Sequence, residues 1–176
     1  MFPSIPPNGE IAAFEITSLP AVGALLVLDI TTPLPGLPVA TPAAPNDVVR
    51  WNPNTSTFSV FFDGAANSIP ASTHIDALSV DSGGSLLLSF DTTVLLPGAG
   101  IVDDEDIVRF AGGVYALLYD GSLNGITPDL DLDALTLEPG STKPSLSFDV
   151  TGRVPGVVFD DEDVVAFDLL GGTYAM

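Results

Sequence analysis

The sequence predicts an all-β fold made of three four-stranded repeats. Short apolar segments rich in β-branched and aromatic residues alternate with turn residues, which is typical of strands. The 17 glycines and 16 prolines are spread between these segments and leave little room for helices. The same series of four segments occurs three times in the same order, and such repetition is typical of repeat architectures.

The repeats span about residues 11–73, 74–130 and 131–176, and together they form one predicted domain at 11–176. Residues 1–10, "MFPSIPPNGE", are predicted to be an extended, proline-rich arm that precedes this domain. The arm has neither the basic nor the apolar region of a signal peptide, so we expect it not to be one.

The four predicted strands of each repeat align between the repeats. The first strands are IAAFEI (11–16), IDALSV (75–80) and LDALTL (132–137). The second strands are LLVLDITT (25–32), LLLSFDTT (86–93) and SLSFDVTG (145–152). The third strands are NDVVRW (46–51), EDIVRF (105–110) and EDVVAF (162–167). The fourth strands are TFSVFFDGA (57–65), VYALLYDGS (114–122) and TYAM (173–176).

Both faces of these strands are largely apolar. In SLLLSFD, three large side chains share one face while Leu87 lies on the other; the three are Leu86, Leu88 and Phe90. A sheet that is apolar on both faces is covered on both, which predicts β-propeller-like blades packed face to face. A β-sandwich or a stacked β-array would satisfy the same pattern. Three blades alone would close very tightly, so the pattern also favours assembly with further copies.

Acidic residues dominate the charge, because 23 Asp and Glu oppose 4 Lys and Arg for a net charge of −19. Phosphate binding needs Lys and Arg, so we expect no nucleic acid partner, whereas cations should be attracted. No apolar run reaches the ~18 residues that a membrane helix needs, so we expect no membrane insertion. The absence of cysteine excludes disulfides, thiolate zinc sites and cysteine nucleophiles.

Two runs of four acids precede the third strands of the last two repeats and are the candidate calcium ligands. They are Asp103, Asp104, Glu105 and Asp106 in the second repeat, and Asp160, Asp161, Glu162 and Asp163 in the third. Calcium takes about six to eight oxygen ligands, so other acids would have to join, such as those of PDLDLDAL at 128–135. Neither run matches the D-x-D-x-D-G calcium loop.

The alternative role of these acids is structural. The first repeat keeps a single acid at this place, so a feature common to all repeats has one carboxylate, that of Asp47, Asp106 or Asp163. One carboxylate suffices to bond the backbone N–H groups of a turn, whereas a metal site needs several. Asp63 and Asp120 each precede a glycine and are likewise predicted to close turns.

No catalytic constellation is present, and we predict that the chain is not an enzyme and needs no cofactor. His74 is the only histidine, and no G-x-S-x-G elbow accompanies it. A hydrolase with two carboxylates is the remaining enzyme hypothesis, but acids that recur with the repeat do not define one unique site. Trp51 aligns with Phe110 and Phe167 as a core position, and stacking on a sugar is the alternative, which keeps a glycan among the partners.

Copies of the same chain are the predicted partners. The third repeat stops inside its fourth strand, at GGTYAM, which predicts an edge that another strand could pair with. The proline-rich arm could also reach a neighbouring copy. The candidate self-association residues are therefore Met1, Phe2, Pro3, Tyr174 and Met176.

The segments DLDAL, LLLSFD, DDEDIVRF and YALLYDGS resemble a tandem repeat of uncharacterised bacterial extracellular and surface proteins. That repeat approximates D-L-D-A-L, L-L-L-S-F-D, F-D-D-E-D-V-x-x-F and W-S-L-x-F-D-G-S. The resemblance covers about 11–176, although the first repeat departs from it with EIAAFEI and APNDVV. It implies a β-rich protein outside the cell or on its surface, and no chemistry.

The sequence therefore predicts a non-enzymatic extracellular structural or interaction protein that assembles with itself into an oligomer or filament. The alternative is a propeller-like module that binds calcium or a glycan through its acidic loops.

Overall fold

The computed structural model describes residues 23–176. These residues form short antiparallel strands and two 3-10 turns, which confirms the predicted all-β class. The predicted arm at 1–10 and the predicted strand at 11–16 lie outside the described residues. Within residues 23–176, no helix has the length and apolar character required to cross a membrane.

The first repeat contributes a three-stranded sheet in the order β1-β2-β3. Its strands are β1 (Ala24–Leu26), β2 (Val48–Asn52) and β3 (Thr57–Phe62), and the 3-10 turn η1 (Ala65–Asn67) follows them. One isolated bridge between Thr32 and Ala43 closes the loop that joins β1 to β2.

The second repeat has a four-stranded sheet in the order β4-β5-β8-β9, as its four predicted strands require. These strands are β4 (Ile75–Val80), β5 (Leu86–Phe90), β8 (Ile107–Ala111) and β9 (Val114–Tyr119). The 3-10 turn η2 (Ser122–Asn124) follows β9. Bulges in the β4–β5 and β8–β9 pairs, between Ile75 and Leu78 and between Ile107 and Val108, shift the register and let the sheet twist.

The third repeat repeats this topology in the order β10-β11-β14-β15. Its strands are β10 (Leu132–Thr136), β11 (Ser145–Phe148), β14 (Val165–Asp168) and β15 (Thr173–Ala175).

The last two repeats each contain a two-stranded hairpin in addition to the four predicted strands. Its strands are β6 (Val94–Leu96) and β7 (Gly100–Val102), and β12 (Gly152–Val154) and β13 (Val157–Phe159). Each hairpin turns at a Pro-Gly pair, whose glycine has a positive φ of 92° at Gly98 and 84° at Gly156. Strands of three residues are too short to show a period of their own, so only the Pro-Gly pairs pointed to them.

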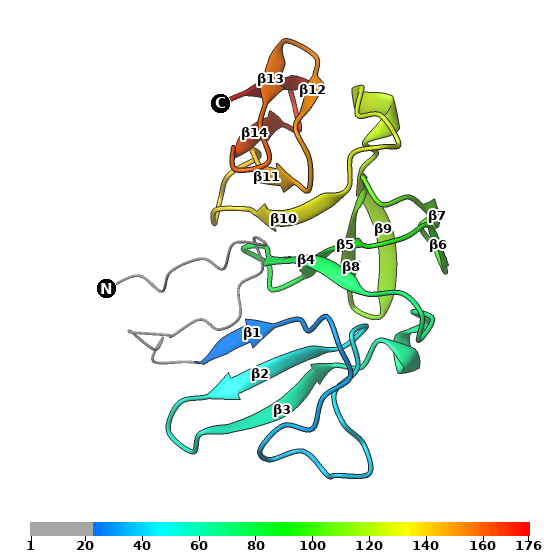
Figure 1. The fold of residues 1–176 in the computed structure, drawn as a ribbon, viewed down its shortest axis with the longest axis vertical. Helices are drawn as coiled ribbons and strands as arrows, with labels where there is room; N and C mark the ends of the chain where they lie inside the picture. Colours follow the sequence, from blue (N-terminus) through cyan, green and yellow to red (C-terminus); the bar gives the residue numbers. More distant parts are fainter. Residues whose placement is uncertain (1–22) are drawn as a thin grey trace.

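The three sheets follow one another along the long axis of the molecule, with the second repeat in the middle (Figure 1). We call the face of a sheet towards the preceding repeat its incoming face, and the face towards the following repeat its outgoing face. In the second repeat, Leu86, Leu88 and Phe90 lie on the incoming face and pack with the first repeat. Leu87 and Ile107 lie on the outgoing face and pack with the third repeat. The middle sheet is therefore covered on both faces, as predicted.

The first strands of the last two repeats, β4 and β10, lie side by side (Figure 1). Across this junction, the backbone N–H of Leu137 donates to Oγ of Ser79 at 3.0 Å. The sheets formed by residues 23–176 remain separate and do not close into a ring, so the propeller arrangement stays a prediction.

An aromatic side chain from each repeat packs edge-on against an aromatic ring of the next. The ring centroids of Phe62 and Phe110 lie 5.0 Å apart at an interplanar angle of 72°. Those of Tyr119 and Phe167 lie 4.7 Å apart at 69°. Pairs of this geometry contribute about 0.5–1.5 kcal/mol beyond the area that they bury, so the same contact stabilises both junctions.

A tyrosine hydroxyl also crosses each junction. Tyr115 donates to the backbone carbonyl of Asn67 at 2.9 Å, and Tyr174 donates to that of Asn124 at 3.1 Å. Both acceptors belong to the 3-10 turn at the end of the preceding repeat. Consecutive repeats are thus joined by the same polar contact as well as the same aromatic one.

Candidate functional site

One aspartate in each repeat bonds the backbone of the turn that leads into the third strand. Its Oδ2 accepts a hydrogen bond from the backbone N–H three residues earlier, at 2.9 Å for Asp47, 3.0 Å for Asp106 and 2.9 Å for Asp163. Oδ1 of Asp47 also accepts from the N–H of Gly64 at 3.0 Å. Oδ1 of Asp106 accepts from the N–H of Gly121 at 2.9 Å. The turn role predicted for these aspartates is confirmed.

The two glycines that bond these carboxylates have no room for a side chain. A Cβ on Gly64 would lie 1.9 Å from the carbonyl oxygen of Asn46. A Cβ on Gly121 would lie 2.3 Å from Cγ of Glu105. Glycine is therefore required here by close packing, with a main-chain φ that any residue could adopt.

The aspartates that precede these glycines start the 3-10 turns. Oδ1 of Asp63 accepts from the N–H of Ala66 at 2.8 Å, and Oδ1 of Asp120 accepts from the N–H of Leu123 at 2.9 Å. Both bonds satisfy backbone donors that the short turn leaves free. This is the turn-closing role that the Asp-Gly pairs predicted.

The first acids of the two runs are bonded to threonines inside their own repeats. Oδ1 of Asp103 accepts from the hydroxyl of Thr93 at 2.8 Å, and Oδ1 of Asp160 accepts from that of Thr151 at 3.3 Å. Like the turn aspartates, these acids accept hydrogen bonds within the chain through one or both carboxylate oxygens. In each run, one acid therefore bonds the turn backbone and another bonds a threonine hydroxyl.

The middle acids of the two runs differ in burial. Glu105 is 2% exposed, and burial together with a hydrogen bond to Asp104 raises the pKa of Glu105 to about 7. Asp161 and Glu162 hold the matching positions in the third repeat and are exposed. The structure therefore does not make the two runs equivalent, because the third repeat covers the first run only.

Further acids gather around the start of β4 and β10, and we call Asp29, Asp76, Asp91, Asp104 and Asp131 the acidic centre. Burial, together with the charges of Asp131, Asp91 and Asp29, raises the pKa of Asp76 to about 7. Burial, together with the nearby charge of Asp104, raises the pKa of Asp131 to about 6. From the sequence, the acids of 128–135 were expected only as additional ligands of the acid runs. The available signal was Asp76 itself, an acid between apolar residues of a predicted strand.

Two carboxylate oxygens of the acidic centre are buried without a hydrogen-bond partner among residues 23–176: Oδ2 of Asp76 and Oδ1 of Asp131. Oε2 of Glu105 is a third such oxygen. Burying an unpaired negative charge is costly, so these groups favour a bound proton or a nearby cation. Within the same residues, no three His, Asp or Glu side chains form a group that could hold a metal ion.

Aspartates at the ends of the second strands fix the start of the first strands. Oδ1 of Asp91 accepts from the N–H of His74 at 2.7 Å, and Oδ1 of Asp149 accepts from that of Asp131 at 3.3 Å. Nδ1 of His74 also lies 3.5 Å from Oδ2 of Asp91. The single histidine thus sits beside a carboxylate that anchors backbone.

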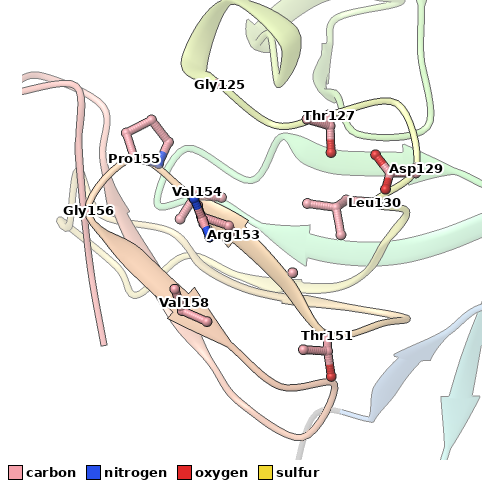
Figure 2. A pocket seen from close by; sticks show the side chains of 11 residues that line it. Gly125, Thr127, Asp129, Leu130, Thr151, Arg153, Val154, Pro155, Gly156 and Val158 are labelled. Atoms are coloured by element: carbon pink, nitrogen blue, oxygen red, sulfur yellow. The ribbon is translucent and has the colours of Figure 1, made fainter.

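An open cleft of about 580 Å³ lies between the hairpin β12–β13 and the chain that joins the second repeat to the third. Figure 2 shows Thr127, Asp129 and Leu130 on the joining chain, and Arg153 and Val158 on the hairpin. The remaining lining is mainly glycine, proline and other small residues. One carboxylate and one guanidinium could orient a polar ligand, but the lining holds no nucleophile beside a base.

The predicted self-association residues fall into two groups. Met1, Phe2 and Pro3 lie outside the described residues. Tyr174 is half-buried, and its hydroxyl bonds within the chain to Asn124 and Tyr119, whereas Met176 is exposed after β15. Tyr174 therefore joins two repeats of one chain.

No protein-family model matches the sequence, and no curated protein matches it.

The turn role of Asp106 can be tested by removing its carboxylate. We expect Asp106→Ala to lower the free energy of unfolding by about 1–3 kcal/mol, because the N–H groups of Asp103 and Gly121 lose their acceptor. Denaturant unfolding measures this loss. Asp161→Ala removes an exposed acid from the equivalent run and should change stability by no more than about 0.5 kcal/mol. Equal effects of the two substitutions would contradict the turn role.

The raised pKa values predict that acidification stabilises the fold. A carboxyl whose folded pKa exceeds its unfolded one contributes stability at low pH that is lost as the pH rises. For Asp76 this window runs from its ordinary value of 3.8 to about 7. We expect Asp76→Asn to raise the free energy of unfolding by about 1–3 kcal/mol at pH 8, and to have little effect below pH 4.

Thermal unfolding of both proteins across this pH range is the measurement. Asp129→Asn, which removes an exposed charge, is the control. A wild-type protein whose stability rises steadily between pH 4 and pH 8 would contradict the proposed protonation.

Proposed function

We propose that this chain is a non-enzymatic structural or interaction protein of the cell surface or exterior. Its β-repeats stack face to face, and it associates with further copies of itself in an oligomer or filament. The observation that carries the proposal is the junction between repeats, which occurs twice with the same aromatic contact and the same tyrosine bond. A junction that is built repeatedly from one set of contacts is suited to assembly.

The charge and composition support this role. A net charge of −19 keeps separate copies soluble, while the mean hydropathy of +0.44 reflects the large apolar surface that the stacked sheets bury. The acids of the two runs bond turns and threonine hydroxyls, and other acids lie in the acidic centre. The exterior location is the expectation that the resemblance to surface repeat proteins implies.

The finer fold that we propose is a stack of propeller-like blades. Face-to-face packing of four-stranded antiparallel sheets and the close approach of the first strands β4 and β10 support it. In such an arrangement, first strands lie innermost and fourth strands outermost. Further copies would continue the series of blades.

A calcium-binding module is the second candidate, and the acidic centre favours it. Oδ2 of Asp76 and Oδ1 of Asp131 are buried and accept no hydrogen bond from the part of the chain that the structure describes. A hard cation prefers such oxygens, and its charge would offset their mutual repulsion. Binding would require the carboxylates to move closer together and to lose their protons. A glycan is the alternative ligand to calcium. Because it is neutral, we place it in the cleft shown in Figure 2 and not in the acidic centre.

Self-association can be tested by measuring mass against protein concentration, with electron microscopy of the concentrated sample. We expect the mass to rise above that of the 18.1 kDa chain. Raising the salt concentration from about 0.05 to 0.5 M should strengthen association, because it screens the repulsion between acidic copies. A monomer at all concentrations and salt levels would contradict the proposal.

Calcium binding can be tested by calorimetry and by the shift in melting temperature at pH 8. If calcium occupies the acidic centre, Asp104→Asn should weaken binding by about tenfold or more, because Asp104 lies beside Asp131. Asp161→Asn, at the matching exposed position, should leave binding unchanged. Absence of both heat and a thermal shift would remove the second candidate.

A further inference from the structure

The cleft between the hairpin β12–β13 and the joining chain carries charged groups that the same place in the second repeat lacks. Arg153 of β12 has Leu95 of β6 as its counterpart, and each is paired with an apolar residue across its hairpin. Asp129 of the joining chain has Ser72 as its counterpart. The two charges are therefore not part of the repeated framework, because the second repeat forms the same hairpin without them.

The joining chain also has the same backbone turn in both places. The N–H of Leu130 donates to the carbonyl of Thr127 at 3.0 Å, as the N–H of Thr73 donates to that of Pro70 at 3.0 Å. Thr127 thus takes the place of a proline and adds a hydroxyl group to the lining of the cleft. The cleft therefore differs from its counterpart in its side chains and not in its backbone.

Close packing at two glycines holds the walls of the cleft together. A Cβ on Gly125 would lie 2.7 Å from Cγ of Pro155, and a Cβ on Gly152 would lie 2.5 Å from Cδ2 of Leu130. The joining chain and the hairpin thus touch at both places, and the space of about 580 Å³ between them is preformed. Small-molecule sites are mostly preformed hollows of about 300–1,000 Å³.

Two opposite charges line this space without pairing. Figure 2 shows Asp129 on the joining chain and Arg153 on the hairpin. Among residues 23–176, the guanidinium of Arg153 has no carboxylate oxygen within 4.0 Å. The other three basic side chains have partners: Arg50 lies over the ring of Phe61, Arg109 pairs with Asp81, and Lys143 pairs with Asp168. A single ligand that carries both signs of charge would pair both Asp129 and Arg153.

We propose that this cleft binds a small zwitterion with an ammonium and a carboxylate group, as a free amino acid or a short peptide has. Arg153 binds the carboxylate through two parallel N–H···O bonds, and Asp129 accepts from the ammonium group. Val158, which is 65% exposed beside Arg153, offers apolar surface to the rest of the ligand.

The charges favour a zwitterion over other ligands of this size. A simple anion would be repelled by the net charge of −19, and a simple cation would leave Arg153 unpaired beside it. A neutral glycan would pair neither charge. The inference is independent of the proposed self-association, because both walls of the cleft belong to one chain.

Titration of the full chain with L-leucine, followed by amide NMR at low salt, tests the proposal. Low salt keeps the acidic copies apart and leaves the charge contacts unscreened. We expect the amides of Thr127 and Arg153 to shift to saturation, with a dissociation constant of roughly 0.1–10 mM because both charged groups are exposed. L-leucyl-L-leucine is the second probe, and the tighter binder of the two distinguishes an amino acid from a short peptide.

Isoamylamine and isocaproate are the chemical controls, because they are leucine without its carboxylate and without its ammonium group. We expect each to bind at least about tenfold more weakly than leucine.

Substitutions with the residues of the second repeat test the two charges. Arg153→Leu and Asp129→Ser should each weaken leucine binding at least about tenfold. Both should fold, because the second repeat has these residues on the same backbone. Lys143→Leu and Asp161→Ser remove the same charges from exposed side chains of the third repeat outside the cleft lining, and should bind leucine like the wild type.

Each contrary outcome overturns the proposal in a different way. If neither leucine nor leucylleucine shifts the amides of the cleft at up to about 50 mM, the cleft is not a zwitterion site. If Lys143→Leu weakens binding as much as Arg153→Leu does, the effect comes from net charge and the assigned contact is wrong. If cellobiose shifts these amides and the two zwitterions do not, the ligand is a neutral glycan and this inference fails. The dependence of mass on concentration tests self-association separately.

Discussion

The carboxylate at the start of each third strand is the interaction on which the arrangement of the repeats depends. Asp106 bonds its own turn through one oxygen and Gly121 through the other, so it fixes where the chain enters η2. Asn124 of η2 then presents its carbonyl to Tyr174 of the next repeat. The same series runs from Asp47 through η1 to the second repeat. One buried carboxylate thus links the turn of a repeat to its junction with the following one.

This dependence explains why the aromatic residues of the two junctions differ while the tyrosine hydrogen bond to the 3-10 turn is the same in both. The edge-on contact uses Phe62 against Phe110 at one junction and Tyr119 against Phe167 at the other, with centroid distances of 5.0 and 4.7 Å. A phenyl ring and a phenol fill nearly the same volume, so packing survives the exchange. The backbone carbonyl that accepts the tyrosine bond is available in either case, because its place is set by the 3-10 turn.

Much of the fold could be predicted because each strand carries its own local signal. The apolar runs that include Leu88 and Leu117 are too long to be turns, so they predict strands. The Asp-Gly pairs mark the ends of the fourth strands, where the turns begin. The single acid common to all repeats predicted a turn carboxylate, and Asp106 has that role. The acidic centre was not predicted, because Asp29, Asp76 and Asp131 come together only when separate repeats stack. The burial of Glu105 likewise depends on the third repeat and has no local signal.

The acidic centre also shows how a chain of charge −19 can pack its repeats closely. Where β4 and β10 approach, Asp76 has a pKa of about 7 and Asp131 one of about 6, so protons neutralise part of the charge that the contact buries. The acids of the third repeat that face solvent, such as Asp161, are not covered in this way by residues 23–176. Packing of the third repeat on the second therefore takes up protons at the buried acids of this contact.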